Sequence, residues 1–410
     1  YAEYFDFLRK KGIRQNLSMM AGHNTAMHSL VGDKPKKPTS AENMQKTKDI
    51  LNEGMNAGTK GISFGLGYKP SIFIPDTELR EIANIAIKRN KLITVHSRVL
   101  GSMAPDVYGN DASEPHNLRW HREWLNLFKG SGARLHISHL LFVGRSAWPY
   151  YDEMMALVQN AMDNFDIDLW FDMYSYIQGP TTLGILMPQV FYDSLPQIYT
   201  DKALVKKLDE ALKEKELARG IRSDDVMLCN PIVPELEEYK GMYMSEICEA
   251  RKMTLAELYI DIYKRTNGFA QVYLMIEQPE ENVPKQMTHP RALYMTDANY
   301  EPNCQQNPSA YGSLAKFLRL TRETGNQPME VTVQKMTGNT AKRFDLFGRG
   351  FIREGYYADI TIFDPATIAE RATSKDPEQS PVGLHHVFIN GQHVLNEDNL
   401  DEALTAGMVL

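Results

Sequence analysis

Three apolar runs of the sequence each end on a residue that can bind a metal ion or move a proton. The runs that begin at residues 92, 135 and 292 end at His96, His139 and Asp297. A strand of a parallel sheet is buried on both faces, so it reads as a nearly continuous hydrophobic run, and a polar residue at its carboxyl end points into a crevice. Zn²⁺ binds neutral imidazoles and carboxylates, and a carboxylate beside it can accept a proton from water. The pattern favours a metal-dependent hydrolase, with all three residues as metal ligands and Asp297 as the catalytic base, over three hydrogen-bonded loop residues.

The composition is typical of a globular protein with a small-molecule partner. The chain has 410 residues, of which 43% are hydrophobic and 24% charged, enough for one large domain and a smaller one. Its net charge of −7 argues against a surface for nucleic acid or an anionic membrane, because such surfaces need clustered lysine and arginine. No segment reaches the roughly 18 to 20 uncharged apolar residues of a membrane span. We therefore expect a small-molecule substrate, no nucleic-acid partner and no membrane partner, and the sequence leaves a homo-oligomer open.

The cysteines and the first residues bear on the cellular location. The three cysteines, an odd number without CxxC spacing, fit a reducing compartment better than a disulfide scaffold. The prediction is therefore a cytoplasmic protein. The sequence opens at Tyr1 and runs at once into an amphipathic helical pattern, as though upstream sequence had been removed, so the lack of a leader carries little weight.

Apolar strand-like runs alternate with amphipathic helices over the first three hundred residues, which predicts a parallel sheet built from βαβ units. Two of the helices are expected at 41–57, with Ser40 as the N-cap, and at 76–89, with acidic residues in the first turn. The segment of about 190–268 reads mostly helical and is expected to be an insertion before the last strand. Six strands are predicted, at 16–22, 61–66, 92–98, 134–140, 169–176 and 293–297.

The pattern changes after residue 345 to short strands separated by glycine turns. Strands are expected at 350–355, 358–363 and 387–394, and the Asn390-Gly391 pair predicts a hairpin inside the last of these. The domain prediction is therefore a hydrolase barrel over 1–345, which includes the helical insertion, and a small β domain over 346–410.

Short motifs occur in a fixed order along the chain, namely GH at 22–23, GISFGL at 61–66, VHSR at 95–98, ISH at 137–139, DMYSY at 172–176, MTHP at 287–290, TD at 296–297, GYYAD at 355–359 and NG at 390–391. Taken together, these motifs resemble those of the N-acyl-D-amino-acid deacylase, or D-aminoacylase, family of the amidohydrolase superfamily. The resemblance implies a (β/α)8 TIM-type barrel, whose strands three to eight are the six predicted here, with a flanking β-sandwich. It also implies one or two zinc ions, bound by His96 and His139 of the fifth and sixth strands, with Asp297 of the eighth as proton shuttle.

Two family elements are not in this sequence. The His-x-His pair of the first strand and the metal-binding cysteine of the second are both missing. Because six strands cannot close an eight-stranded barrel, we expect the remaining strands to come from a longer native chain or from a separate polypeptide. The strand at 61–66 also lacks the lysine that bridges two metals in many amidohydrolases, which agrees with the D-aminoacylase branch.

Four further residues are predicted to contact the substrate. Tyr174 and Tyr176 share one face of a strand end, where a phenol can hydrogen-bond a carbonyl or a carboxylate, as the counterpart of Tyr176 does in the family; packing at the barrel mouth is the alternative. Arg98 lies two residues past His96 and either reaches the same mouth or forms a salt bridge to a loop. Ser63, in the motif at 61–66, completes the set.

Two departures from the family bear on the substrate. Leu141 stands where the family has a lysine, and the family's carboxylate-binding arginine is missing from the stretch 307–312. Losing two cations removes the charge-assisted pairing that holds an amino-acid carboxylate. We expect either an amide without that carboxylate, or a substitute cation from Arg98, Arg145 or Lys316.

Three functions remain after this reasoning. The first is zinc-dependent hydrolysis of a small linear amide resembling an N-acyl-D-amino acid, by an enzyme acting on carbon–nitrogen bonds other than peptide bonds. The second is hydrolysis of a cyclic amide, of the hydantoinase or dihydroorotase kind, which the missing lysine disfavours. The third is a catalytically silent barrel used for binding, which needs neither zinc nor Asp297.

Overall fold

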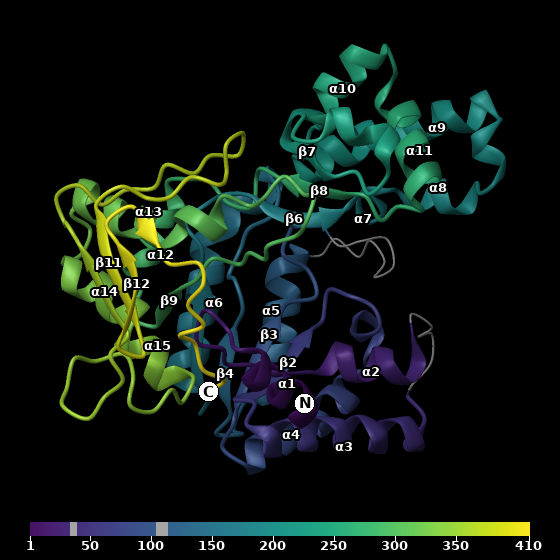
Figure 1. Cartoon of the computed structure of the whole chain (residues 1–410). Coiled ribbons are helices and arrows are strands. Elements are labelled where there is room, and N and C mark those ends of the chain that lie inside the picture. The colour runs from purple at the N-terminus through teal and green to yellow at the C-terminus, as the bar shows by residue number, and fades with distance from the viewer. Residues whose placement is uncertain (33–38, 104–113) are drawn as a thin grey trace.

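The computed structural model describes residues 1–32, 39–103 and 114–410 (Figure 1). The six predicted strands form one sheet, in the order β1-β2-β3-β4-β5-β9, and every neighbouring pair is parallel. The predicted α/β class with a parallel, barrel-type sheet is therefore confirmed, and over the described residues the sheet is open between β1 and β9. The strands are β1 (Ala21–Gly22), β2 (Gly61–Gly65), β3 (Leu92–His96), β4 (Arg134–Ile137), β5 (Asp168–Met173) and β9 (Ala292–Tyr294).

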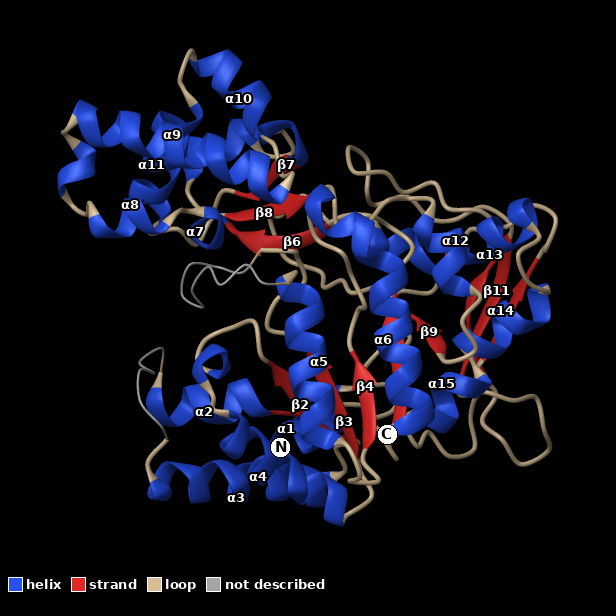
Figure 2. Cartoon of the chain, turned by 180° about the vertical axis from the view of Figure 1, so that it is seen from behind, coloured by secondary structure: helices blue, strands red, loops and turns tan. Residues whose placement is uncertain are grey.

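Helices between these strands cover the sheet and build the main core (Figure 2). The predicted helix at 41–57 is confirmed, and the Ser40 hydroxyl accepts a hydrogen bond from the Asn43 amide at 3.2 Å. This cap satisfies one of the free N–H groups of the first turn. These helices are α1 (Ala2–Lys11), α2 (His23–Val31), α3 (Ala41–Ala57), α4 (Asp76–Lys88), α5 (His116–Phe128) and α6 (Tyr151–Asn164), with α12 (Asn282–Met287), α13 (Ser309–Thr324), α14 (Met329–Met336) and α15 (Gly338–Arg343) around and after β9.

A second unit lies between β5 and β9 and has its own apolar core. It contains a three-stranded antiparallel sheet, in the order β6-β8-β7. The segment 190–268 is mostly helical, as predicted, and β7 is a strand that the prediction did not include. The strand was missed because its apolar run is only five residues long and lies among charged helices. The elements are β6 (Gly179–Thr182), β7 (Val226–Asn230), β8 (Gln271–Leu274), α7 (Leu183–Leu186), α8 (Gln189–Asp193), α9 (Lys202–Arg219), α10 (Met244–Arg251) and α11 (Leu255–Thr266).

The C-terminal residues form a four-stranded antiparallel sheet, β10 (Ile360–Phe363), β11 (Leu384–Ile389), β12 (Gln392–Asn396) and β13 (Asn399–Leu400). The predicted hairpin is confirmed: Asn390 and Gly391 join β11 to β12 with φ of 49° and 81°, which a tight hairpin loop requires of both residues. The strand predicted at 350–355 is wrong, because turns at Gly350 and Gly355, both with positive φ, break the segment.

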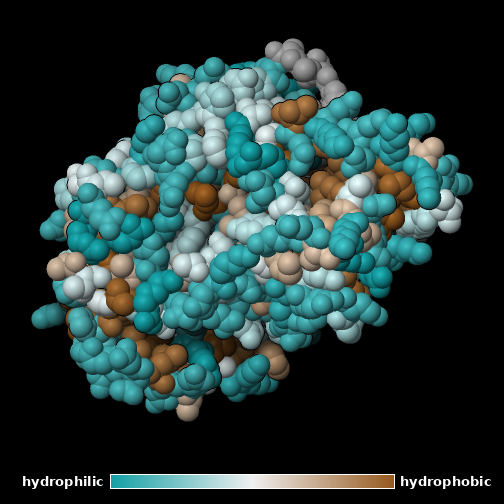
Figure 3. Space-filling view, turned by 90° about the horizontal axis from the view of Figure 1, so that it is seen from above, coloured by the Kyte–Doolittle hydropathy of each residue, from teal (hydrophilic) through white to brown (hydrophobic). Residues whose placement is uncertain are grey.

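The surface seen from above is mostly hydrophilic, with hydrophobic residues in small separate patches (Figure 3). Among the described residues, no helix has the length and apolar character needed to cross a membrane. The first predicted strand is also shorter than expected, since only Ala21–Gly22 pairs with β2, while Leu17 forms an isolated bridge to Val409.

Candidate active site

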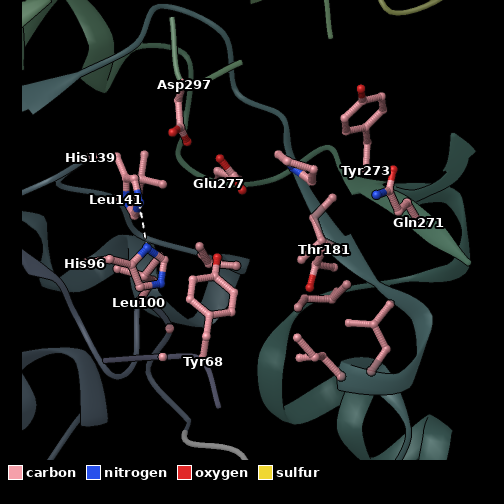
Figure 4. A pocket seen from close by; sticks show the side chains of 18 of the residues that line it. Tyr68, His96, Leu100, His139, Leu141, Thr181, Gln271, Tyr273, Glu277 and Asp297 are labelled. Atoms are coloured by element: carbon pink, nitrogen blue, oxygen red, sulfur yellow. Dashed lines mark hydrogen bonds between the residues drawn. The ribbon is translucent and has the colours of Figure 1, made fainter. Parts of the chain in front are cut away.

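His96 and His139 meet at the carboxyl ends of the adjacent strands β3 and β4. His96 Nδ1 lies 2.6 Å from His139 Nε2, and the ring centroids are 4.5 Å apart with the planes at 76° (Figure 4). Residues that are 43 positions apart are therefore brought into direct contact by the parallel pairing of the two strands. The fold thus brings together His96 and His139, the two histidines that end the predicted apolar runs.

His139 and Asp297 share an unusual backbone conformation. Their φ angles are 41° and 46°, in the left-handed region that residues other than glycine seldom adopt. Such a conformation costs on the order of 1–3 kcal/mol per residue and recurs at functional sites. At both positions it falls just after a strand ends, where the chain turns into the loops that surround the site.

Asp172, near the end of β5, supports the histidine pair from behind. One of its oxygens accepts a hydrogen bond from the His139 backbone N–H, and the other lies 2.8 Å from His136 Nε2. His136 is fully buried and packs edge-on against the ring of Phe344. His136 thus anchors the carboxylate that fixes the backbone of His139.

Asp297 follows β9, lines the same cavity and lies next to His139 in the close view (Figure 4). Burial raises the pKa of its carboxyl group above the ordinary value, with a further rise from Asp172, and His139 opposes this change. Burial lowers the pKa of His96 well below its ordinary value, and His139 and His121 lower it further. His96 is therefore held as a neutral imidazole, which is the form that binds metal ions.

These three residues line one cavity of about 320 Å³, at the lower end of the range for small-molecule sites. The cavity lies between the carboxyl ends of the sheet and the inserted unit. Its apolar lining residues are Leu100, Val143, Ile185, Leu186, Ile221 and Leu274. Its polar lining residues from β8 and from the loop after Asp297 are Gln271, Tyr273, Asn299, Glu301, Gln306 and Asn307.

The donor groups of the histidine pair suit zinc, which takes neutral imidazoles at two or more positions. A ring nitrogen of each histidine points at the other, and His139 Nδ1 is buried without a hydrogen-bond partner. In the described part of the chain, however, no three His, Cys, Asp or Glu side chains are close enough to surround one ion. The described residues therefore offer two imidazoles as candidate ligands, with the Asp297 carboxylate in the same cavity.

The predicted substrate contacts are not brought together. Of the four, only Arg98 is among the described residues that line the cavity, and Ser63, Tyr174 and Tyr176 are not. The Tyr176 hydroxyl donates to the carbonyl of Ala372 at 2.8 Å, and Tyr174 is buried against Leu141 and Tyr176. The two tyrosines thus take the packing role that was the alternative for them.

Arg98 is held by the backbone. Its guanidinium donates to the carbonyl oxygens of Ser71, Ile72 and Ile74 at 3.2, 3.0 and 2.6 Å, and it lies over the ring of Trp120. With Asp76 3.8 Å from the guanidinium as well, these contacts fix the loop after β2 against β3 and engage both terminal nitrogens of Arg98.

The other two candidate cations also have partners. Arg145 forms a bidentate ion pair with Asp225, and Lys316 lies 3.1 Å from Glu280 and over the ring of Tyr176. Neither residue lines the cavity. A substitute for the family's carboxylate-binding cations is therefore not found among the three that the sequence offered.

Tyr68 and Glu277 also line the cavity, and the sequence analysis did not identify them. Tyr68, in the loop after β2, places its ring 4.7 Å from that of His96, and burial together with Asp297 and Glu277 raises its pKa to about 12. Glu277 follows β8 and is 7% exposed. It ends an apolar run, 272–276, so the signal that identified the histidines was present for it as well.

Comparison with known proteins covers nearly the whole chain. No family model matches. A D-aminoacylase of Alcaligenes xylosoxydans xylosoxydans is 26% identical over 398 residues, which are 97% of this chain and 70% of that protein. An N-acyl-D-aspartate deacylase from the same organism is 24% identical over 96% of this chain and 69% of its own length. The chain is a relative of the D-aminoacylases.

Solved structures of D-aminoacylases share its fold. A crystal structure of D-aminoacylase superposes with a TM-score of 0.78 at 23% identity, and the match covers 100% of this chain and 74% of that one. An N-acyl-D-glutamate deacylase from Bordetella bronchiseptica, solved with zinc and a phosphonate inhibitor, gives 0.79 at 24% identity, with the same coverage. These structures show that the fold is shared, and the sequence matches to the curated deacylases confirm the resemblance predicted from the motifs.

The relatives also bear on the predicted chemistry. They are deacylases, so the predicted class, an amidohydrolase acting on carbon–nitrogen bonds other than peptide bonds, is the class of this family. D-aminoacylase has been solved with copper and described with a binuclear metal centre, and the deacylase above with zinc. A cofactor of one or two zinc ions agrees with these relatives.

Proposed function

We propose that this chain carries the core of a zinc-dependent hydrolase of small linear amides, with Asp297 as the group that moves the proton. The observation that supports this proposal most strongly is the contact of two imidazole nitrogens, 2.6 Å apart, in a cavity that also holds the Asp297 carboxylate. Amide hydrolysis needs a polarised carbonyl, an activated water and a proton for the leaving amine.

His96 and His139 are the residues that hold the metal in this proposal. A bound zinc ion supplies a Lewis acid and lowers the pKa of water to about 7. Asp297 takes the proton from the attacking water and then delivers it to the nitrogen of the leaving amine, so it acts first as general base and then as general acid. Asp172 keeps His139 in place through its backbone N–H.

The amine part of the substrate, in this proposal, does not need a free carboxylate. Arg98, Arg145 and Lys316 are all engaged by protein groups, so none is free to form the bidentate pair that a carboxylate prefers. Neutral hydrogen-bonding groups such as Gln271 and Asn307 line the cavity instead. The substrate class that fits is an N-acylated amine or amino-acid amide.

Hydrolysis of paired substrates tests this function. Zinc-loaded protein is assayed with N-acetyl-amino acids and with their C-terminal amides, in both enantiomers. We expect release of acetate that is abolished by chelation and restored by zinc, with the amides hydrolysed at least as well as the acids. A clear preference for the free acids contradicts the proposed substrate, and turnover that survives chelation contradicts the proposed mechanism.

Location and assembly remain predictions. The cytoplasmic location follows from the sequence reasoning alone, and the sequence leaves a homo-oligomer open. Size-exclusion chromatography with light scattering measures the oligomeric state directly.

A further inference from the structure

Glu277 is a buried carboxylate in the cavity wall without a counter-charge. It is 7% exposed, its Oε2 has no hydrogen-bond partner, and its carboxylate has no ion pair with any described residue. The backbone around it is fixed, because its N–H donates to the carbonyl of Ile177 and its own carbonyl accepts from the N–H of Phe142, both at 2.9 Å. The side chain is therefore held at this place by the fold, while its charged end is left without a partner.

A glycine in β6 makes room for this carboxylate. A Cβ at Gly179 would lie 2.0 Å from Glu277 Oε1 and 2.4 Å from its carboxyl carbon. The backbone of Gly179 is not in the left-handed region, so its conformation does not require glycine. The close approach of the Glu277 carboxylate to β6 does require glycine at position 179. This contact holds the carboxylate against β6.

The surroundings of Glu277 are negative. Asp297 and Glu301 line the same cavity, while the guanidinium of Arg98 is held by three backbone carbonyls and Arg219 has an interaction of its own. Burial, and after it the nearby Asp297, raises the pKa of Glu277 well above its ordinary value. A carboxylate left unpaired in such a place is costly, and a positive ligand group would remove that cost.

Glu277 does not belong to the metal site. No three potential ligands among the described residues are close enough to share one ion, so Glu277 does not join His96, His139 and Asp297 around a metal in this fold. In the close view, Glu277 lies between Asp297 and Thr181 (Figure 4). A group that it receives therefore lies beside the proposed reacting centre, in a cavity whose lining also includes apolar residues.

We propose that Glu277 binds a cationic group of the substrate, an ammonium or guanidinium carried on a short alkyl arm. The arm lies along apolar lining residues of the cavity, where Ile185 and Leu274 can contact its methylene groups, and the cation pairs with the buried carboxylate. A charged pair of this kind is strongest where water is excluded, and it rejects a neutral analogue that leaves the carboxylate unpaired. As a statement about substrate choice, this inference rests on the proposed function.

A matched pair of substrates tests the inference. Nα-acetyl-lysinamide and Nα-acetyl-norleucinamide, each in both enantiomers, differ chiefly in the terminal ammonium. We expect the zinc-loaded wild type to favour the cationic substrate by at least about 10-fold in kcat/KM, and Glu277→Gln to lose most of that preference. The control is Glu281→Gln, which removes an exposed carboxylate four residues away and keeps the preference. Equal use of both substrates by the wild type overturns the inference.

A second variant tests the role of Glu277 independently, in case the first variant misfolds. Gly179→Ala keeps the carboxylate but places a methyl group where Glu277 Oε1 lies, so it lowers the preference without removing the charge. Glu277→Gln should fold at least as well as the wild type without ligand, because the amide keeps the shape of the side chain and removes the charged form that burial disfavours. Thermal melts of both variants check this, and a preference unchanged in both folded variants refutes the role of Glu277.

A binding measurement separates this inference from the proposed function. Calorimetric titration with n-butylamine at pH 7 uses a monocation on an alkyl arm and needs no turnover. We expect binding to the wild type and at least about 10-fold weaker binding to Glu277→Gln. If neither amide is hydrolysed but butylammonium binding depends on Glu277, the cation site stands and the amidase function fails. If amides are hydrolysed while butylammonium binds both proteins equally, the function stands and the cation site fails.

Discussion

His96 Nδ1 and His139 Nε2 face each other across 2.6 Å, although the two histidines come from different strands. The pairing of β3 with β4 aligns Val95 with Ile137, so His96, the last residue of β3, and His139, two residues past β4, lie at the same edge of the sheet. The left-handed backbone of His139 then turns the chain toward the loop over the cavity. Two nitrogen donors and a carboxylate are thereby brought into one cavity.

Loss of either histidine should remove the metal. His96→Asn and His139→Asn each take away one imidazole donor, so we expect loss of bound zinc and a fall of more than about 100-fold in kcat/KM for the amide substrates. Zinc content by atomic absorption and the kinetic assay measure the two effects. The control is His393→Asn in β12, which lies outside the cavity and should keep both values. Retention of stoichiometric zinc by both site variants contradicts the ligand roles.

Replacement of Asp297 should lower the catalytic rate without lowering the stability of the fold. Asp297→Asn keeps the shape of the side chain but cannot accept the proton, so we expect kcat to fall by about 10²- to 10⁴-fold. Because the variant removes a buried carboxylate, its melting temperature should stay at or above that of the wild type. An Asp297→Asn variant with wild-type kcat contradicts the assignment of the proton-transfer group.

Asp172 is predicted to act through His139. Asp172→Asn keeps an acceptor for only one of the two contacts, to the His139 N–H or to His136, so one buried group loses its partner. We expect a loss of about 1–3 kcal/mol in the free energy of unfolding and a zinc affinity lower by about 10- to 100-fold. Urea denaturation and a competitive zinc titration measure these effects. The exposed Asp163→Asn change on α6 is the control, and an Asp172→Asn variant that matches it in zinc affinity contradicts the supporting role.

Lys335 should make stability depend on pH above neutrality. The residue is 2% exposed, its ammonium group donates to the carbonyls of Met287 and His289, and burial lowers its pKa from 10.5 to about 8. The unfolded chain therefore binds more protons than the folded one between pH 8 and 10.5, so the wild type gains stability relative to Lys335→Met across this window, by at most about 3 kcal/mol. Urea unfolding of both proteins from pH 7 to 10.5 measures the difference. A stability difference that stays constant over this range contradicts the lowered pKa.

The features that sequence predicts well are those set by local pattern. The helix at 41–57 follows from its apolar stripe and from Ser40, and the hairpin at Asn390 and Gly391 follows from turn chemistry. The six parallel strands follow because each is an apolar run between helices. Polar residues at the ends of such runs converge by the geometry of a parallel sheet, which is why the positions of His96 and His139 were predictable.

The features that sequence predicts poorly depend on contacts between distant segments. Arg98 was a candidate for substrate binding, but the loop at 71–74 offers it three carbonyl oxygens, and no spacing pattern reveals this arrangement. The hydroxyl of Tyr176 is engaged by Ala372, which lies almost two hundred residues away. Glu277 enters the cavity from the inserted unit, whose position over the sheet is a tertiary feature.

In the proposed site, His96 and His139 hold the metal beside Asp297. A crystal structure of zinc-loaded protein tests this arrangement most directly. Anomalous scattering at the zinc edge locates the ion without reference to activity. We expect an anomalous zinc peak at about 2.0–2.2 Å from His96 Nδ1 and His139 Nε2, inside the cavity that Asp297 lines. A fully occupied zinc ion elsewhere, with no peak between these two nitrogens, contradicts it.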